Sequence, residues 1–179
     1  MLDLKVADPH IPPLDSFELS ADETAAVEAA LMTGDPWNED AAELAGHRLC
    51  LTAVKQRLAT LHMQRQDNKC CYCRKQIGEH GVFLRDREHI LPKSKYGLLT
   101  YAPFNISVAC KRCNMSVKGN KTDFVADPAS IADAPTQTAG YLFVHPNFDR
   151  WDDHLEHFHF QIPNVTLVHY SVKAGSGKG

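Results

Sequence analysis

The chain has 179 residues, of which 44% are hydrophobic and 23% are charged, and its formal net charge is −3. This length and composition fit a globular protein with an ordinary core and exclude a disordered or collagen-like chain. No apolar run approaches the roughly 18 residues of a membrane span. The N-terminus also lacks the basic and apolar stretches of a secretory signal, so we expect a cytoplasmic protein without membrane contact.

Residues 1–66 are predicted to form an N-terminal arm and a helical unit. Ser20 and Glu23 have the spacing of a capping box, and they open an alanine-rich helix that should end near Gly34. A second helix is expected over residues 38–66. Its apolar face, at helical spacing, consists of Leu51, Val54, Leu58 and Leu61. We expect this face to pack in the core, and docking of a partner subunit is the alternative.

Positive charge gathers in the middle of the chain. Residues 64–121 contain 12 Lys and Arg against four Asp and Glu, a net charge of +8, whereas the rest of the chain carries −11. Such a concentration of basic side chains suits a polyanionic partner such as a nucleic acid. A solvated basic face without a ligand is the alternative.

Residues 67–125 contain two Cys-x-x-Cys pairs, and their members are Cys70, Cys73, Cys110 and Cys113. Four thiolates can close the tetrahedral shell of a structural zinc ion. Because 36 residues separate the pairs, one zinc ion would clamp both ends of an inserted unit. A redox pair or chance spacing is the alternative. Cys71 is a possible competing ligand, and Cys50 is expected to be a core residue.

Glu88 and His89 lie between the two cysteine pairs. Phosphodiester hydrolysis needs an activated water and a cation that absorbs charge on the phosphate. An imidazole can take the proton of that water near neutral pH, and a carboxylate is a hard ligand that suits Mg²⁺ or Mn²⁺. Asn114, directly after Cys113, can supply a further oxygen ligand. Neighbouring residues of a strand point to opposite faces, so Glu88 and His89 meet one substrate only if the strand is bent or bulged.

Strands are expected at residues 82–84 and 88–91, and a helix from Asn114 onward. After a loop, the tail should contain strands at residues 141–144 and 165–170. The intervening stretch, residues 145–160, is rich in His and acidic residues. A second metal site there is one possibility, and contact of Arg150 or His154 with a nucleic-acid backbone is another.

The central motifs closely resemble the HNH endonuclease family, which has the ββα-metal fold. The resemblance covers about residues 67–121 and rests on Glu88-His89-Ile-x-Pro, on Asn105 and on Cys113-Asn114. It implies that His89 is the general base and that Glu88 and Asn114 bind the catalytic ion. It also implies that Asn105 holds the loop between the two strands and so steadies the His89 ring.

The chain departs from the commonest family pattern in three ways. Glu88 stands where Asp is usual, and Asn114 stands where a third His is often found. Val117 fills the position where a lysine commonly follows the last motif, with Lys118 one residue later. The residues expected to contact nucleic acid are Lys93, Lys95, Lys111, Arg112 and Lys118.

We therefore expect an α+β fold: an N-terminal helical unit over residues 1–66, a zinc-stabilised ββα-metal core over residues 67–125, and a small β-rich tail over residues 126–179 that packs on the core. The expected activity is metal-dependent hydrolysis of DNA, with structural Zn²⁺ and catalytic Mg²⁺ or Mn²⁺. The organisation is similar to nuclease subunits of anti-phage systems such as Septu and certain retrons, which work with an ATPase. That similarity implies a defence subunit bound through the N-terminal helices. A catalytically silent, zinc-dependent nucleic-acid-binding module and a nuclease that is active only with its partner are the alternatives.

Overall fold

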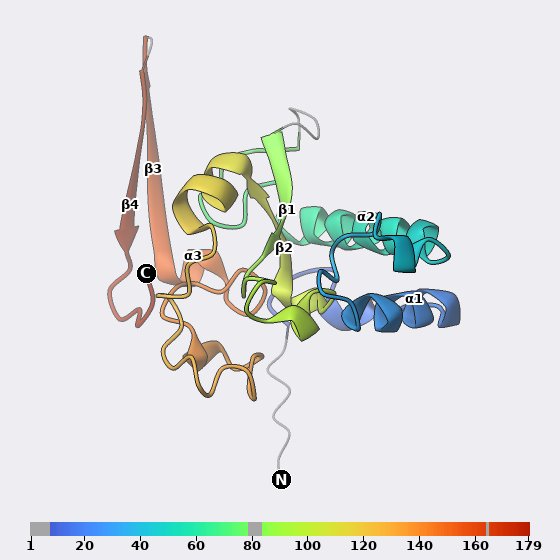
Figure 1. Ribbon diagram of the computed structural model, residues 1–179. Coiled ribbons are helices and arrows are strands. Elements are labelled where there is room, and N and C mark those ends of the chain that lie inside the picture. Colours follow the sequence, from blue (N-terminus) through green and yellow to red (C-terminus); the bar gives the residue numbers. More distant parts are fainter. Residues whose placement is uncertain (1–7, 79–83, 164) are drawn as a thin grey trace. The chain divides into compact units, whose positions relative to one another are not determined.

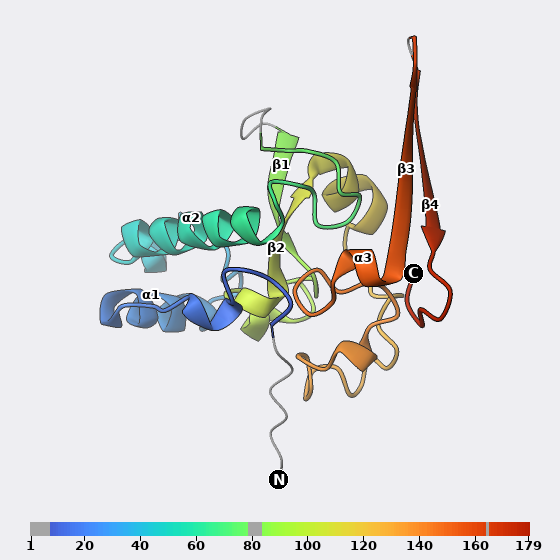
Figure 2. The ribbon, with the colours of Figure 1, turned by 180° about the vertical axis from the view of Figure 1, so that it is seen from behind.

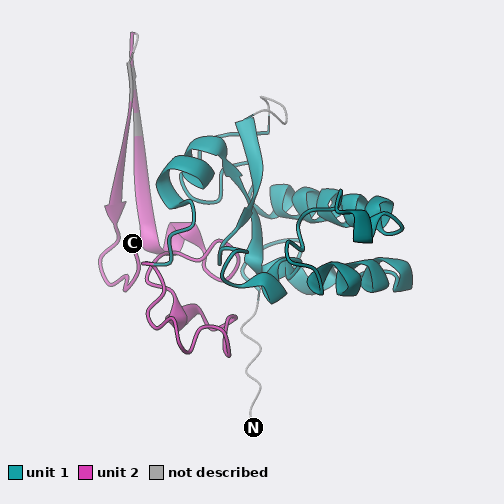
Figure 3. Ribbon diagram, viewed as in Figure 1, with its two compact units in different colours: residues 1–122 teal, residues 123–179 magenta. Residues whose placement is uncertain are grey.

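A computed structural model describes residues 8–78, 84–163 and 165–179. The chain divides into two compact units, residues 1–122 and residues 123–179 (Figure 3). Both helices and small sheets are present (Figure 1), so the expected α+β class is confirmed. Among the described residues, no helix is both long and apolar enough to cross a membrane.

Helix α1 (Ala21–Leu31) begins as the capping box predicts. The Ser20 hydroxyl accepts a hydrogen bond from the Glu23 amide at 3.2 Å, and the Glu23 carboxylate accepts one from the Ser20 amide at 2.9 Å. Two of the otherwise unpaired N–H groups at the helix start are thereby satisfied.

Helix α2 (Arg48–Arg65) begins ten residues later than expected. The Asp35 side chain accepts a hydrogen bond from the Trp37 amide, and the Asn38 side chain accepts one from the Asp40 amide, both at 3.3 Å. Such local bonds compete with helix formation and favour turns. A short 3-10 helix, η2 (Ala42–Leu44), follows before α2 starts.

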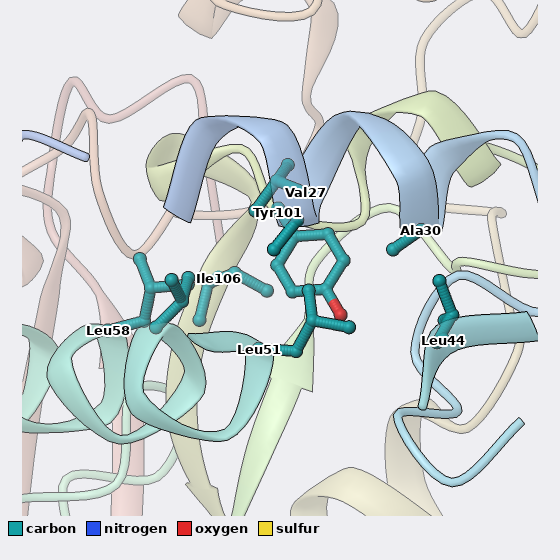
Figure 4. Close-up of a cluster of buried hydrophobic side chains, with 9 residues drawn as sticks. Val27, Ala30, Leu44, Leu51, Leu58, Tyr101 and Ile106 are labelled. Atoms are coloured by element: carbon teal, nitrogen blue, oxygen red, sulfur yellow. The ribbon is translucent and has the colours of Figure 1, made fainter. Parts of the chain in front are cut away.

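Helices α1 and α2 lie side by side (Figures 1 and 2) and pack through an apolar cluster (Figure 4). We call it the helical cluster, and its buried members are Ala26, Val27, Ala30, Leu44, Leu51, Val54, Leu58, Tyr101 and Ile106. Leu61, the remaining residue of the predicted α2 face, is also buried. Core packing of this face is therefore confirmed. Cys50 packs against the same cluster.

Strands β1 (Arg85–His89) and β2 (Ile106–Cys110) form an antiparallel pair. Their register runs without interruption from Arg85 opposite Cys110 to His89 opposite Ile106. The strand predicted at residues 88–91 thus begins earlier and ends at His89, before Pro92. Of the strand predicted at residues 82–84, residues 82 and 83 lie outside the described residues.

A short helix, η6 (Arg112–Lys118), follows β2 and completes a ββα arrangement (Figure 1). It starts two residues before the predicted position and is a π-helix, a form often found at functional sites. The Gly119 amide donates to the Asn114 carbonyl at 2.8 Å. Gly119 then ends the helix with φ of +51°, a conformation that glycine adopts readily.

The second unit contains α3 (Trp151–His154) and an antiparallel hairpin of β3 (Leu155–Ile162) and β4 (Val165–Val172). The predicted strand at residues 165–170 is confirmed within β4. The strand predicted at residues 141–144 is wrong, because Tyr141 forms only an isolated bridge with Val125. The Tyr141 side chain is buried instead, against the His145 ring.

Candidate metal and nuclease site

The four predicted zinc ligands come together in the first unit. The sulfur atoms of Cys70, Cys73, Cys110 and Cys113 all lie within 4.8 Å of one another. A tetrahedral zinc ion with Zn–S bonds of about 2.3 Å places its sulfurs about 3.8 Å apart, and the Cys73 and Cys110 sulfurs are 3.9 Å apart. The set therefore fits a structural zinc ion. Within the described residues it is the only such cluster, and it includes neither Cys71 nor a residue of the His-rich tail.

Backbone contacts place the two cysteine pairs. In the first pair, the Arg74 amide donates to the Cys70 carbonyl at 3.0 Å, and Arg74 has φ of +57°. The second pair spans the end of β2 and the start of η6. The Cys110 amide donates to the Cys70 sulfur at 3.3 Å, which stabilises negative charge on that sulfur. Hydrogen bonds from the neighbouring thiols, chiefly Cys113, lower the pKa of Cys70.

Glu88 is 1% exposed and contacts Tyr72, which lies within the first cysteine pair. Its Oε1 atom accepts a hydrogen bond from the Tyr72 hydroxyl at 3.1 Å and is 2.7 Å from the Lys118 ammonium. Burial raises the pKa of Glu88, and the charge of Lys118 opposes that shift. Tyr72 stands between Cys70 and Cys73, so the first cysteine pair directly supports this carboxylate.

The His89 ring is held by two neighbours. Its Nε2 atom is 3.0 Å from the Thr100 carbonyl oxygen, and its centroid is 4.5 Å from that of Trp37 in an edge-to-face contact. A carbonyl only accepts hydrogen bonds, so Nε2 carries the proton and Nδ1 retains a lone pair. Burial lowers the pKa of His89 to about 4, which keeps the ring neutral near pH 7.

Asn105 is completely buried directly before β2 and binds the backbone of the loop that follows β1. Its side-chain oxygen accepts a hydrogen bond from the Leu91 amide at 2.7 Å, and its amide group donates to the Leu91 and Leu99 carbonyls at 3.1 Å each. These bonds join two positions of the loop between β1 and β2, which also contains Thr100, the partner of His89.

Asn114 lies in η6, and its Nδ2 atom donates to the Asp86 carboxylate at 3.2 Å. Asp86 and Glu88 are two residues apart in β1 and so share a face of the strand. Carboxylate and side-chain amide oxygens are hard donors of the kind that suits Mg²⁺ or Mn²⁺, and the structure brings Asn114 to Asp86. Lys118 is the partner of Glu88: its ammonium contacts the Glu88 carboxylate and donates to the His89 carbonyl.

The side chains of Glu88 and His89 have different neighbours. The uninterrupted register leaves no bulge within β1, but the strand ends at His89 and the chain bends at Ile90 and Leu91. The bend expected from the sequence therefore lies at the end of the strand. Glu88 faces Tyr72 and Lys118, whereas His89 faces Trp37 and Thr100. In this structure the two groups are linked through Lys118, which bonds to the Glu88 side chain and the His89 backbone.

The basic residues predicted to contact nucleic acid differ in their surroundings. Lys93 pairs with Asp35 at 2.6 Å, and Lys95 donates to the Thr122 hydroxyl at 3.0 Å. Lys111 and Arg112 are exposed. Only 10% of the Lys118 side chain is exposed, so this lysine belongs to the interior of the site.

Three residues at this site were not singled out as functional from the sequence: Trp37, Tyr72 and Asp86. The sequence could have indicated two of them. Asp86 stands two residues before Glu88, and Tyr72 stands within a Cys-x-x-Cys pair. Trp37 comes from the connection between α1 and α2, and no local pattern indicates its contact with His89.

Comparison with known proteins supports the family resemblance. Residues 70–126 match the family model described as HNH endonuclease. Neither curated proteins nor solved structures gave a significant match. The matched residues include all four zinc-ligand candidates, Glu88, His89, Asn105 and Asn114. The chain therefore contains an HNH endonuclease domain over residues 70–126, and this domain supports a metal-dependent nuclease in general.

Proposed function

We propose that this protein hydrolyses DNA phosphodiester bonds, with His89 as the general base. The observation that carries the proposal is the orientation of the His89 ring: Nε2 is 3.0 Å from the Thr100 carbonyl oxygen, so Nδ1 retains the lone pair. Burial also lowers the pKa of His89, which favours the neutral ring. A neutral imidazole with a lone pair on Nδ1 can accept the proton of an attacking water. Asn105 supports this arrangement because it binds the same loop.

Glu88 and Asn114 are the proposed ligands of a catalytic Mg²⁺ or Mn²⁺ ion, and Asp86 extends the set of oxygen donors. Such an ion supplies positive charge that stabilises the phosphate as it reacts. The Lys118 ammonium, 2.7 Å from the Glu88 carboxylate, balances its negative charge. The proposed zinc ion is structural, because four cysteine ligands leave no position open for substrate.

Lys93, Lys95, Lys111 and Arg112 are proposed contacts for the DNA backbone. Lys111 and Arg112 are exposed between Cys110 and Cys113, and Lys93 forms an ion pair with Asp35. Phosphate contacts of this kind orient a nucleic acid without reading its sequence. Lys118 is better assigned to the neutralisation of Glu88.

The physiological setting that we propose is an anti-phage defence complex in which an ATPase or another subunit binds the N-terminal helices. The similarity of the motifs to those nuclease subunits supports it. The apolar face of α2 is buried in the helical cluster, so a partner would use other residues. Met32 and Leu49 are 89% and 86% exposed and are candidates. Co-purification followed by a size measurement, with Leu49→Asp as the disrupting variant, tests this assignment.

A plasmid-nicking assay with Mg²⁺, Mn²⁺ or EDTA tests the nuclease proposal. We expect metal-dependent nicking by the wild type and a loss of about 100-fold or more in His89→Ala, because general-base catalysis contributes 10² to 10⁴-fold. Asn114→Ala should need a higher metal concentration. His169→Ala is the matched control, since His169 is exposed in β4. Zinc content measured for every variant excludes misfolding, and equal nicking by all of them would refute the catalytic assignment.

The same assay separates the nuclease from a catalytically silent binding module. A silent module would bind DNA without Mg²⁺-dependent nicking, and His89→Ala would leave its affinity unchanged. A nuclease that needs its partner would nick only once the partner is added.

A further inference from the structure

A cleft of about 970 Å³ lies between α2 and β1 in the first unit. Gln56, Thr60 and Gln64 of α2 form one wall, and Arg85 and Arg87 of β1 lie on the other. The three α2 residues are exposed and lie one turn apart on a single face of the helix. The cleft volume lies within the range of natural small-molecule sites.

The cleft combines three kinds of surface. Trp37, Met63 and Val108 provide apolar lining, and Met63 and Val108 are 6% and 2% exposed. The α2 wall offers amide and hydroxyl groups that can donate and accept hydrogen bonds. The β1 wall offers two guanidinium groups. The Arg87 guanidinium lies 5.8 Å from the centroid of the Trp37 ring.

A nucleotide has the matching chemistry. Its base has apolar faces and a hydrogen-bonding edge, and its phosphate is an anion that arginine binds well. Asp86 is the one carboxylate among the lining residues and cannot balance both guanidinium groups, so a neutral apolar ligand would leave one of these positive charges without an anionic partner. An acidic peptide would satisfy the arginines but would leave much of the amide wall and apolar lining unused. Charge and polarity together therefore favour nucleic acid.

The cleft is continuous with the proposed catalytic site. Asp86 and Asn114, two of the oxygen donors assigned to the catalytic ion, also line it. Trp37 lines the cleft and contacts the His89 ring. A strand whose nucleotide occupied the cleft would therefore bring its backbone to the reacting groups.

We propose that the α2–β1 cleft binds an unpaired nucleotide of the substrate strand and thereby directs the enzyme to single-stranded DNA. In a duplex each base is stacked and paired, and bringing it to an apolar lining requires unstacking. An unpaired base can enter without that cost. The inference rests on the proposed nuclease function, because it specifies the substrate of the same site.

The test measures DNA binding by fluorescence anisotropy in the zinc-loaded, full-length His89→Ala protein, so that the probe is not cut. The probes are a labelled oligothymidine of 20 nucleotides and a duplex of equal length. Gln64→Glu and Gln64→Lys change the charge of the cleft wall at an exposed position. Leu49→Glu and Leu49→Lys are the matched controls, because Leu49 lies in the same helix, is 86% exposed and does not line the cleft.

We expect Gln64→Glu to weaken binding of the single strand about fivefold and Gln64→Lys to tighten it by a similar factor, in line with one added or removed phosphate contact. The Leu49 pair should change the affinity less than twofold. Thr60→Trp, which fills the cleft, should weaken single-strand binding about tenfold, the scale of one lost base contact. Duplex binding should respond less to each cleft variant.

Equal effects at Gln64 and Leu49 would overturn the proposal, as would an equal response of the single strand and the duplex. Mg²⁺-dependent cleavage of the single-stranded oligothymidine by the protein with native His89 is measured in parallel and keeps the two proposals apart. If that protein cleaves the oligothymidine but binding is insensitive to the charge at position 64, the cleft proposal fails and the nuclease proposal stands. If it cleaves neither the oligothymidine nor the plasmid while binding follows the charge at position 64, the nuclease proposal fails and the cleft proposal stands.

Discussion

The first unit contains two buried clusters that are built on different physical principles. The helical cluster joins α1 and α2 through aliphatic side chains and Tyr101. The second, which we call the cysteine cluster, consists of Met63, Cys70, Cys71, Ile77, Val108, Ala109 and Cys113. The helical cluster can be stabilised by apolar burial alone, whereas the cysteine cluster has a small apolar area and includes two zinc-ligand candidates. The comparison teaches that the nuclease motif lies between the two clusters. Glu88 contacts Tyr72, which packs against the cysteine cluster, whereas His89 contacts Trp37, which packs against the helical cluster.

The two clusters nevertheless share two elements. Helix α2 contributes Leu58 to the helical cluster and Met63 to the cysteine cluster, and β2 likewise contributes Ile106 and Val108. A change in one cluster can therefore reach the other through a continuous helix or strand. Substitutions made in one cluster at a time measure how strongly the other cluster responds.

Removal of zinc should have the largest effect. Zinc binding to small structural sites is worth about 10–16 kcal/mol, comparable to or greater than the roughly 5–15 kcal/mol of whole-domain stability. We expect Cys113→Ser, or treatment with a zinc chelator, to unfold the cysteine cluster and abolish nicking. Hydrogen exchange should show lost protection at residues 106–118 but persisting protection in α1.

Cys50→Ser is the control for that experiment, because Cys50 packs against the helical cluster and is not a zinc-ligand candidate. It should retain a full equivalent of zinc. Unchanged protection at residues 106–118 after complete zinc loss would show that the cysteine cluster is stable through burial alone, and the contrast between the clusters would disappear.

Truncation in the helical cluster should have the next largest effect. Leu51 is 0% exposed, and Leu→Ala at such a position costs about 2–5 kcal/mol through lost burial and the cavity left behind. We expect Leu51→Ala to lower the free energy of unfolding by that amount while zinc remains bound in the folded protein. Denaturant unfolding with a parallel zinc assay measures both quantities. Leu49→Ala, at an 86% exposed position, should change stability by less than about 0.5 kcal/mol.

Gln66 connects the end of α2 to β2, where the two clusters meet. Its side-chain amide donates to the Val108 and Lys69 carbonyls at 2.7 and 2.6 Å, and its oxygen accepts from the Val108 amide and the Ser107 hydroxyl at 2.9 Å each. Gln66→Ala leaves these buried groups without their partner, so we expect a loss of about 1–3 kcal/mol.

Gln64→Ala is the matched control for Gln66, since Gln64 is exposed two residues earlier in the chain. A double variant that combines Gln66→Ala with Leu51→Ala tests the energetic coupling between the two clusters. Additive losses would mean that the clusters are energetically independent. A coupling energy above about 0.5 kcal/mol would show that Gln66 transmits a change from one cluster to the other.

The sequence predicted the features of both clusters that depend on local pattern. The spacing of Leu51, Val54 and Leu58 indicated the buried face of α2, and the two Cys-x-x-Cys pairs indicated the sulfur cluster. The late start of α2 was missed because Asp35 and Asn38 form turns that compete with an otherwise helical sequence.

Contacts between distant segments were beyond the reach of such patterns. Trp37 and His89 are 52 positions apart in the sequence, and their contact follows only from the way the connection between α1 and α2 packs on the β1–β2 pair. The alternation of side chains along a strand predicted that Glu88 and His89 point to opposite faces, but it could not predict which residues each side chain contacts.

The strand predicted at residues 141–144 failed for a different reason. Its apolar residues suit a strand, but in the structure this segment buries the Tyr141 ring and forms only an isolated bridge.

The ion pair of Asp8 and Arg65 should have the smallest effect, and it lies at the end of α2 where the clusters meet. Burial raises the pKa of Asp8, but hydrogen bonds from Arg65, Leu14 and His10 outweigh burial and lower it. The Arg65 guanidinium is 2.8 Å from the carboxylate. The lowered pKa means that the ionised carboxylate stabilises the fold above its unfolded pKa of about 3.9. That contribution is lost as the pH falls through the folded pKa.

We therefore expect Asp8→Asn to be less stable than the wild type at pH 7 and the difference to shrink below about pH 4. Thermal unfolding measured from pH 7 to pH 3 checks this. In an Arg65→Gln background most of the pH-dependent difference should vanish, because the main partner of the carboxylate is gone. If the stability difference instead remains unchanged in the Arg65→Gln background, the Leu14 and His10 amides stabilise the ionised carboxylate. The segment that follows Asp8 would then be held by these local hydrogen bonds rather than by the ion pair with α2.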